Sequence, residues 1–133
     1  MNAQEFESAV RELRQLQRRF FRCKKDDPDR EKAKILMREK EKVVLNVIET
    51  VMAIRPRGKQ AEGEREQFLL DVAEMLRRQK DWMKQGGGHW YMNPAKDAEL
   101  KVDKQLTKWD ERKKEEEKAR RAELMKNQTS LFQ

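Results

Sequence analysis

Apolar residues in this chain recur every three or four positions, in four stretches separated by proline or glycine. That spacing places them on one face of an α-helix, whereas a half-buried strand would need apolar residues at alternate positions. The stretches predict four helices, at about residues 3–25, 28–54, 62–85 and 94–126. Because each helix must bury an apolar face, we expect an all-α fold: a small helical bundle with a long, projecting C-terminal helix.

The sequence also predicts how these helices begin and connect. In KKDDPD, Asp27 can cap the second helix and Pro28 suits its first turn, where the missing N–H costs no intrahelical hydrogen bond. So short a connection favours an antiparallel hairpin. Three glycines at 86–88 end the third helix, and Asn93 and Pro94 then repeat the cap-and-proline pattern.

The apolar faces define the expected core. The segment VVLNVIETVMAI, residues 43–54, is apolar over most of its circumference, so we expect this half of the second helix to lie nearest the core. The residues expected to be buried are Phe6, Val10, Leu13, Leu16, Phe20, Ala33, Leu36, Val43, Val47, Val51, Ile54, Phe68, Leu69, Val72, Met75, Leu76, Trp82, Met83, Val102, Leu106 and Trp109.

Beyond Trp109 the fourth helix loses its apolar face and becomes almost entirely charged. Acid-before-base pairs four residues apart stabilise an isolated helix by about 0.2–0.5 kcal/mol each. Three such pairs are expected here: Asp110–Lys114, Glu116–Arg120 and Glu117–Arg121. We therefore expect a bundle domain at 1–109, a solvated helix at 110–126 and a flexible peptide tail at 127–133.

The chain is basic, with 32 lysines and arginines against 25 acids and a net charge of +7. Such a balance favours attraction to nucleic acid or another anionic surface, without defining a site. Five cations lie on the arc of the first helix opposite its apolar face: Arg11, Arg14, Arg18, Arg22 and Lys25. Two interpretations fit this stripe, namely nonspecific contact with DNA phosphates or an ordinary solvated face.

No constellation in the sequence indicates catalysis. His89 is the one histidine, and no second histidine or cysteine cluster accompanies it to suggest a metal site. The glycines at 86–88 lack the Lys-Ser/Thr ending of a phosphate-binding loop. The sequence therefore predicts a protein that is not an enzyme and needs no cofactor or metal. Trp90, Tyr91 and Met92 are expected either to plug the end of the bundle or to contact a partner.

The single cysteine, Cys23, excludes a disulfide within the chain and fits a reducing compartment. No apolar stretch is long enough to cross a bilayer, and the N-terminal residues lack the apolar segment of a signal peptide. We therefore expect a soluble cytoplasmic protein, associated with the nucleoid and not with a membrane.

The segment QTSLF, formed by Gln128, Thr129, Ser130, Leu131 and Phe132, resembles the motif Gln-Leu-Ser/Asp-Leu-Phe. Bacterial replication and repair proteins use that motif to dock on the sliding clamp, the ring-shaped processivity factor of the replicative polymerase. Thr129 stands where the motif has leucine. The resemblance implies that Leu131 and Phe132 anchor in an apolar pocket of the clamp while the Gln128 amide bonds at its edge. It implies an accessory protein that modulates DNA replication or repair.

The first sixty residues, and 10–44 in particular, also resemble small helical-hairpin proteins of unknown role from phages and prophages, which implies a bacterial, phage or mobile-element origin. Two alternatives to clamp docking stay open. The chain could be a structural or assembly protein that forms a homo-oligomer, with Leu131 and Phe132 in the contact. It could equally bind DNA nonspecifically and without the clamp.

Overall fold

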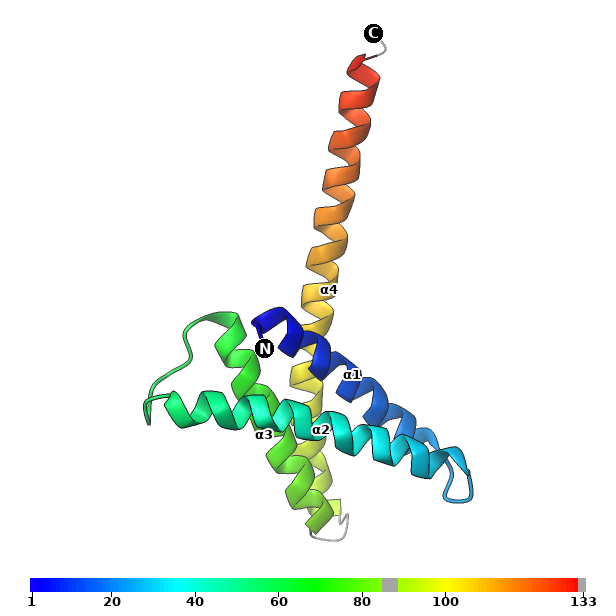
Figure 1. Ribbon diagram of the computed structural model, residues 1–133, viewed down its shortest axis with the longest axis vertical. Helices are drawn as coiled ribbons and strands as arrows, with labels where there is room; N and C mark the ends of the chain where they lie inside the picture. Colours follow the sequence, from blue (N-terminus) through cyan, green and yellow to red (C-terminus); the bar gives the residue numbers. More distant parts are fainter. Residues whose placement is uncertain (85–88, 132–133) are drawn as a thin grey trace.

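The computed structural model describes residues 1–84 and 89–131, with side chains at 1–84 and 94–128. Within those residues there are four helices and no strand. The helices are α1 (Ala3–Arg22), α2 (Asp29–Ile54), α3 (Gly63–Lys84) and α4 (His89–Leu131). The predicted all-α bundle is therefore confirmed (Figure 1).

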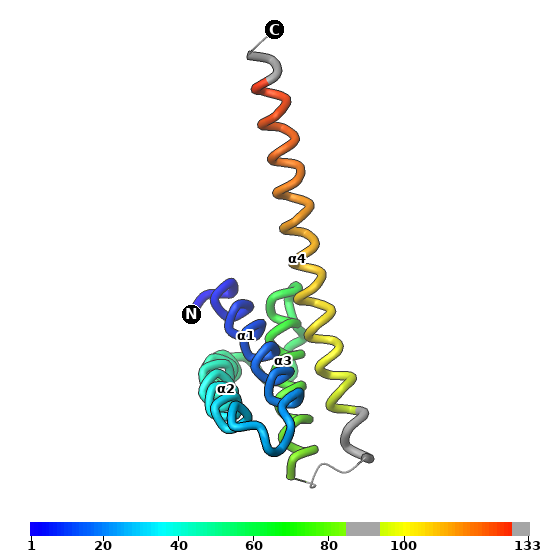
Figure 2. The backbone as a smooth tube through the Cα atoms, turned by 90° about the vertical axis from the view of Figure 1, so that its right-hand side faces the viewer, coloured from blue at the N-terminus to red at the C-terminus, as the bar shows by residue number. Residues whose placement is uncertain are grey.

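The helices form two antiparallel hairpins, α1 with α2 and α3 with α4, which pack across each other (Figure 1). Seen from the side, α2 and α4 lie at opposite edges of the body, with α1 and α3 between them (Figure 2). The predicted N-terminal hairpin is confirmed. In both views the C-terminal half of α4 projects beyond the other three helices.

A side-chain cap fixes where α1 begins. The Asn2 Oδ1 accepts a hydrogen bond from the backbone N–H of Glu5 at 2.8 Å, and such a cap stabilises a helix by about 1 kcal/mol. The start of α2 differs from the prediction by one residue. Pro28, and not Asp27, is the N-cap residue, and its side chain makes no cap hydrogen bond. The Asp27 Oδ1 still accepts a hydrogen bond from the N–H of Asp29 at 2.9 Å.

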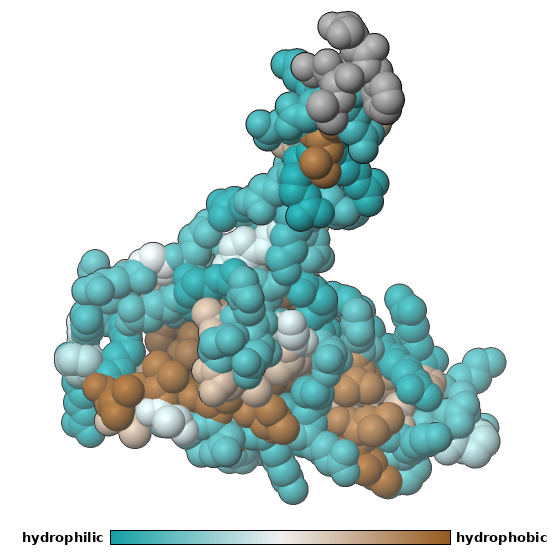
Figure 3. Space-filling view, turned by 45° about the horizontal axis from the view of Figure 1, so that its top comes forward, coloured by the Kyte–Doolittle hydropathy of each residue, from teal (hydrophilic) through white to brown (hydrophobic). Residues whose placement is uncertain are grey.

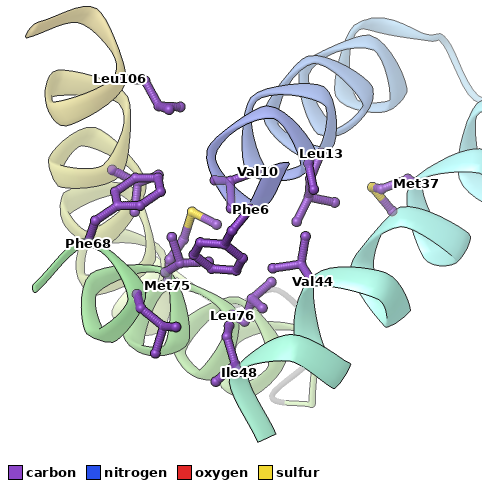
Figure 4. Packing of buried hydrophobic residues seen from close by; sticks show 14 of the residues in the cluster. Phe6, Val10, Leu13, Met37, Val44, Ile48, Phe68, Met75, Leu76 and Leu106 are labelled. Atoms are coloured by element: carbon purple, nitrogen blue, oxygen red, sulfur yellow. The ribbon is translucent and has the colours of Figure 1, made fainter. Parts of the chain in front are cut away.

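The core lies between the two hairpins, and all four helices contribute to it (Figure 4). At its centre the Phe68 ring contacts Phe6 edge-on at 5.9 Å and Trp109 at 4.8 Å. The buried apolar residues that form this cluster are Phe6, Ala9, Val10, Leu13, Phe20, Ala33, Met37, Val44, Ile48, Phe68, Leu69, Val72, Met75, Leu76, Val102, Leu106 and Trp109. Burying a large apolar side chain contributes about 1.5–3 kcal/mol, so this cluster is the main source of stability.

The prediction for α2 is wrong about which face is buried. Ala33 is buried as expected, but Leu36, Val43 and Ile54 are 36%, 42% and 81% exposed. Val47 and Val51 are only partly buried against the core. The buried positions are instead Ala33, Met37, Val44 and Ile48. Because α2 is apolar over most of its circumference, its place at the edge of the body, and not its pattern, selects the buried face.

The predicted core holds better in α1, α3 and α4, with three exceptions. Leu16 and Trp82 are only partly buried. Met83 is 51% exposed, because it lies near the end of α3, beyond the central contacts. No helix among the described residues combines the length and apolar character needed to cross a membrane.

The bounds of α4 also differ from those predicted. The helix begins at His89, so Asn93 and Pro94 lie within it and Asn93 is not its cap. Pro94 lies beyond the first turn, so its missing N–H removes one intrahelical hydrogen bond. At the other end α4 continues to Leu131, since no proline or glycine interrupts residues 94–131 after Pro94. The whole helix is about 65 Å long at 1.5 Å per residue.

Candidate partner-binding and nucleic-acid interfaces

The distal part of α4 is a solvent-exposed rod, residues 111–128, in which every side chain is exposed. Its last ion pair with the body is made by Lys113, whose Nζ lies 3.6 Å from the buried carboxylate of Glu7. Two large apolar side chains occur further along it, Leu124 and Met125, at 54% and 67% exposure. The rod therefore carries the end of α4 away from the body, as Figure 1 shows.

Of the three ion pairs predicted along the rod, one is formed. Arg121 lies 2.9 Å from Glu117, one turn away. Among the described side chains Glu116 and Arg120 make no ion pair, and Asp110 binds Arg11 of α1 at 2.7 Å instead of Lys114. Asp110 therefore belongs to the body, and the rod proper starts after it.

The five residues of the clamp-like motif are described only in part. Gln128 is exposed at the end of the rod. Thr129, Ser130 and Leu131 continue the backbone of α4, and their side chains lie outside the described residues, as does all of Phe132. Residues 127–131, expected as a tail, are thus part of the helix.

The arginine stripe of α1 is exposed only in part, because α4 covers the rest of it. Arg14 is only 6% exposed. Its Nε and Nη2 donate to the two carboxylate oxygens of Asp103 at 2.8 and 3.0 Å, and its Nη1 donates to Gln17 at 2.6 Å. The expectation of a phosphate contact by Arg14 is therefore incompatible with this buried position.

Arg11 and Arg18 are also held by carboxylates. Arg11 contacts Glu7 at 3.0 Å and Asp110 at 2.7 Å, and Arg18 contacts Asp103 at 3.0 Å. Burial raises the pKa of the Asp103 carboxyl, but hydrogen bonds from Arg14 and Arg18 outweigh it and hold that pKa below its usual range. Most of the stripe joins α1 to α4.

The sequence analysis missed the acids that bind this stripe. Glu99, Asp103 and Asp110 are four and seven residues apart, which places them on one face of α4. That face lies against the arginines of α1, with Glu99 3.6 Å from Arg14. An acidic face on one helix and a basic face on another could have indicated the pairing before the fold was known.

Glu7 is a second missed residue, and it joins three helices. Its side chain is 2% exposed and accepts hydrogen bonds from Arg65 of α3 at 2.7 Å and Arg11 of α1 at 3.0 Å. Burial raises its pKa, but these two hydrogen bonds and Lys113 of α4 lower it further than burial raises it. The buried carboxylate therefore stays ionised and fixes the base of the rod.

A basic corner remains open where α1 turns into α2. Arg22 and Lys25, the last two members of the predicted stripe, are exposed and make no ion pair within the described residues. Arg19 and Lys24 beside them are likewise exposed and unpaired in that part of the chain. A shallow hollow next to them is lined by Gln15, Arg18, Arg19, Arg22, Cys23 and Asp27. This corner is the part of the predicted stripe that solvent and a polyanion can reach.

The segment first considered for chemistry is only partly described. The glycines at 86–88 lie outside the described residues. His89, Trp90, Tyr91 and Met92 have helical backbone at the start of α4, and their side chains are not described. In the described part of the chain, no cluster of three histidine, cysteine or carboxylate side chains could hold a metal ion.

Comparison with protein-family models, with curated proteins and with solved structures found no match to this chain.

Proposed function

We propose that this protein is a non-enzymatic accessory factor that docks on the bacterial sliding clamp through Gln128, Thr129, Ser130, Leu131 and Phe132, and so modulates DNA replication or repair. The observation that supports the proposal is the rod of residues 111–128, which projects beyond the other helices (Figure 1) and ends at the exposed Gln128, the first residue of the motif. Apolar residues at the end of a charged, exposed helix contribute little to folding. Their chemistry fits an apolar pocket on another molecule.

The contact would be weak and readily exchanged. Burying two anchors the size of leucine and phenylalanine contributes at most about 3–6 kcal/mol, and ordering the peptide subtracts from that amount. Even the full 6 kcal/mol would correspond to a dissociation constant of only about tens of micromolar, so the net contact should be weaker than that. Recruitment by such a contact is reversible.

We also propose a second, independent contact, between the basic corner and DNA phosphates. The observation that favours it is the group of exposed cations without ion pairs at Arg19, Arg22, Lys24 and Lys25. A clamp encircles duplex DNA, so docking would raise the local concentration of phosphates around the body. Two weak contacts on one chain would then reinforce each other.

Clamp docking is tested by measuring the binding of purified bacterial sliding clamp to the full chain and to matched variants. Leu131→Ala with Phe132→Ala should abolish binding, because both anchors are lost. Leu124→Ala with Met125→Ala removes similar apolar groups from the same rod and should leave binding unchanged. Thr129→Leu restores the consensus residue and should strengthen it. Equal clamp binding by all four proteins would rule the proposal out.

DNA contact is tested separately, by measuring duplex binding against salt concentration. Arg22→Gln with Lys25→Gln should weaken binding and reduce the slope of log K against log salt by about 2, since each phosphate contact contributes about 0.9. Lys114→Gln with Lys118→Gln removes the same charge from the rod and serves as the control. If the two double variants weaken DNA binding equally, net charge governs binding and the proposed contact at the basic corner is wrong. The proposal of clamp docking does not depend on this result.

A further inference from the structure

The face of α2 that the sequence predicts as core is an apolar stripe that this chain leaves open. Leu36, Val43, Val47 and Ile54 lie along one side of the helix, at successive spacings of seven, four and seven residues. Three of them are substantially exposed, Ile54 to 81%. With Lys40 and Thr50 they complete an alternation of four and three residues, the spacing by which one helix packs along another.

The two polar members of this α2 stripe already have partners within the chain. The Lys40 Nζ lies 2.6 Å from a carboxylate oxygen of Glu12 in α1. The Thr50 hydroxyl donates to the backbone carbonyl of Asn46 at 2.8 Å. A second helix could therefore cover the stripe without leaving an unpaired charge or hydroxyl beneath it.

The surroundings of the stripe leave room for such a helix. A groove runs between α2 and the N-terminal half of α1, and Met1, Ala9, Glu12, Lys40 and Val43 are among its lining residues. Because α2 lies at the edge of the body opposite α4, the rod does not obstruct it (Figure 2). In Figure 3 hydrophobic residues gather on the lower part of the body, below the rod.

We propose that a second copy of this chain occupies the stripe, forming an antiparallel α2–α2 dimer. A spacing of seven, four and seven is the same from either end, so the stripe is complementary to itself. A two-fold axis that crosses the stripe midway between Val43 and Val47 places Leu36 opposite Ile54 of the second copy and Val43 opposite its Val47. A symmetric dimer needs this self-complementarity, because both copies use the same patch.

Charge favours the antiparallel arrangement over the parallel one. About the same axis, Lys40 lies opposite Thr50 of the second copy, so no like charges meet in the seam. In a parallel pair Lys40 would face the second copy's Lys40, and like charges directly opposite each other oppose pairing. The position of one lysine thus favours the antiparallel orientation.

The size of the stripe sets the strength of the contact. From Leu36 to Ile54 it spans about 27 Å, and a helix is about 10 Å wide, so each copy would cover about 300 Å². A stable interface usually covers about 800 Å² per partner. The dimer should therefore be weak, and its population should rise with protein concentration.

The test is sedimentation equilibrium of the full chain over a wide range of concentration. Val43→Lys and Ile54→Lys should each raise the dimer dissociation constant at least tenfold. Leu45→Lys and Met52→Lys alter residues that are 38% and 43% exposed, close to the 42% of Val43, on the opposite side of α2 and should leave the dissociation constant unchanged. Thermal melting followed by circular dichroism shows that each variant is folded. Sedimentation as a monomer throughout, or loss of the dimer with the tail variant Leu131→Ala, Phe132→Ala alone, would overturn the proposal.

The register is tested by cross-linking in a Cys23→Ser background. Leu36→Cys mixed with Ile54→Cys should form a disulfide-linked dimer, whereas each variant alone should not. Self-linking of either variant would indicate a parallel pair and refute the antiparallel dimer. These measurements do not involve the clamp, so their outcome is independent of the proposed function.

Discussion

Arg14 and Asp103 form a two-pronged ion pair that joins α1 to α4, with N–O distances of 2.8 and 3.0 Å. Arg14 is 6% exposed, and its remaining nitrogen is bonded to Gln17. A buried guanidinium depends on its carboxylate, because without it the cost of removing the charge from water is not offset.

Asp103→Ala should therefore lower the free energy of unfolding by about 2–4 kcal/mol, measured by urea denaturation. Arg18 contacts the same carboxylate but is 46% exposed, so Arg18→Ala should cost less than about 1 kcal/mol. Replacing both charges, by Arg14→Met with Asp103→Leu, should recover most of the loss. A loss from Asp103→Ala as small as that from Arg18→Ala would contradict this role.

Stability should fall in acid partly through Glu64. Hydrogen bonds from Arg112, and then from Trp109, lower the pKa of Glu64 from 4.5 to about 2 in the folded chain. As the pH falls, Glu64 is protonated in the unfolded chain before it is protonated in the folded chain. Its contribution to the free energy of unfolding is therefore present above pH 4.5 and is lost as the pH falls towards 2. Carboxyl NMR titration should give the low pKa, and Glu64→Gln should show a shallower loss of stability over that range. A pKa for Glu64 near 4.5 would refute the prediction.

Trp109 is where the core and the charged contacts of α4 meet. Its ring is 5% exposed, lies against Phe68, and carries the Arg65 guanidinium 4.0 Å from its centre. Trp109→Ala should lower the free energy of unfolding by about 3–5 kcal/mol, since it removes a large buried side chain and leaves a cavity. Trp82 is only partly buried, so Trp82→Ala should lower the free energy of unfolding by clearly less. Similar losses for the two variants in thermal melts would contradict this difference.

The part of the rod beyond Lys113 should contribute almost nothing to the stability of the body. Residues beyond Lys113 make no ion pair with the other helices within the described part of the chain, and those up to Gln128 are exposed. A chain ending at Lys118 should therefore unfold in urea within about 0.5 kcal/mol of the full chain. A larger loss would show that the rod folds back onto the body.

Much of the fold could be predicted from the sequence because its helices are amphipathic and clearly separated. The spacing of Val102, Leu106 and Trp109 marks a buried stretch of α4, and all three are buried. Asp27 and Pro28 locate the start of α2 to within one residue. These features depend on local chemistry, which a single stretch of sequence contains.

The errors arise where the neighbour of a helix decides the outcome. On α2 both sides are apolar, so burial of Val44 and exposure of Val43 depend on where α1 and α3 lie. On α1, the sequence places Arg14 on the polar face, and it is buried only because Asp103 of α4 binds it. Among the candidate partner-binding residues, the sequence alone singles out the clamp-like motif, while the open basic corner emerges only after the paired arginines are removed from the predicted stripe.

The rod also has an electrostatic consequence. From Glu111 to the end of α4 at Leu131 the helix spans about 30 Å at 1.5 Å per residue. At physiological ionic strength the Debye length is about 8 Å, so the field of the basic body is almost fully screened at the far end of α4. A partner held at Leu131 would therefore be indifferent to the charge of the body. Substitutions that change the surface charge of the body should therefore leave binding at the far end of α4 unchanged.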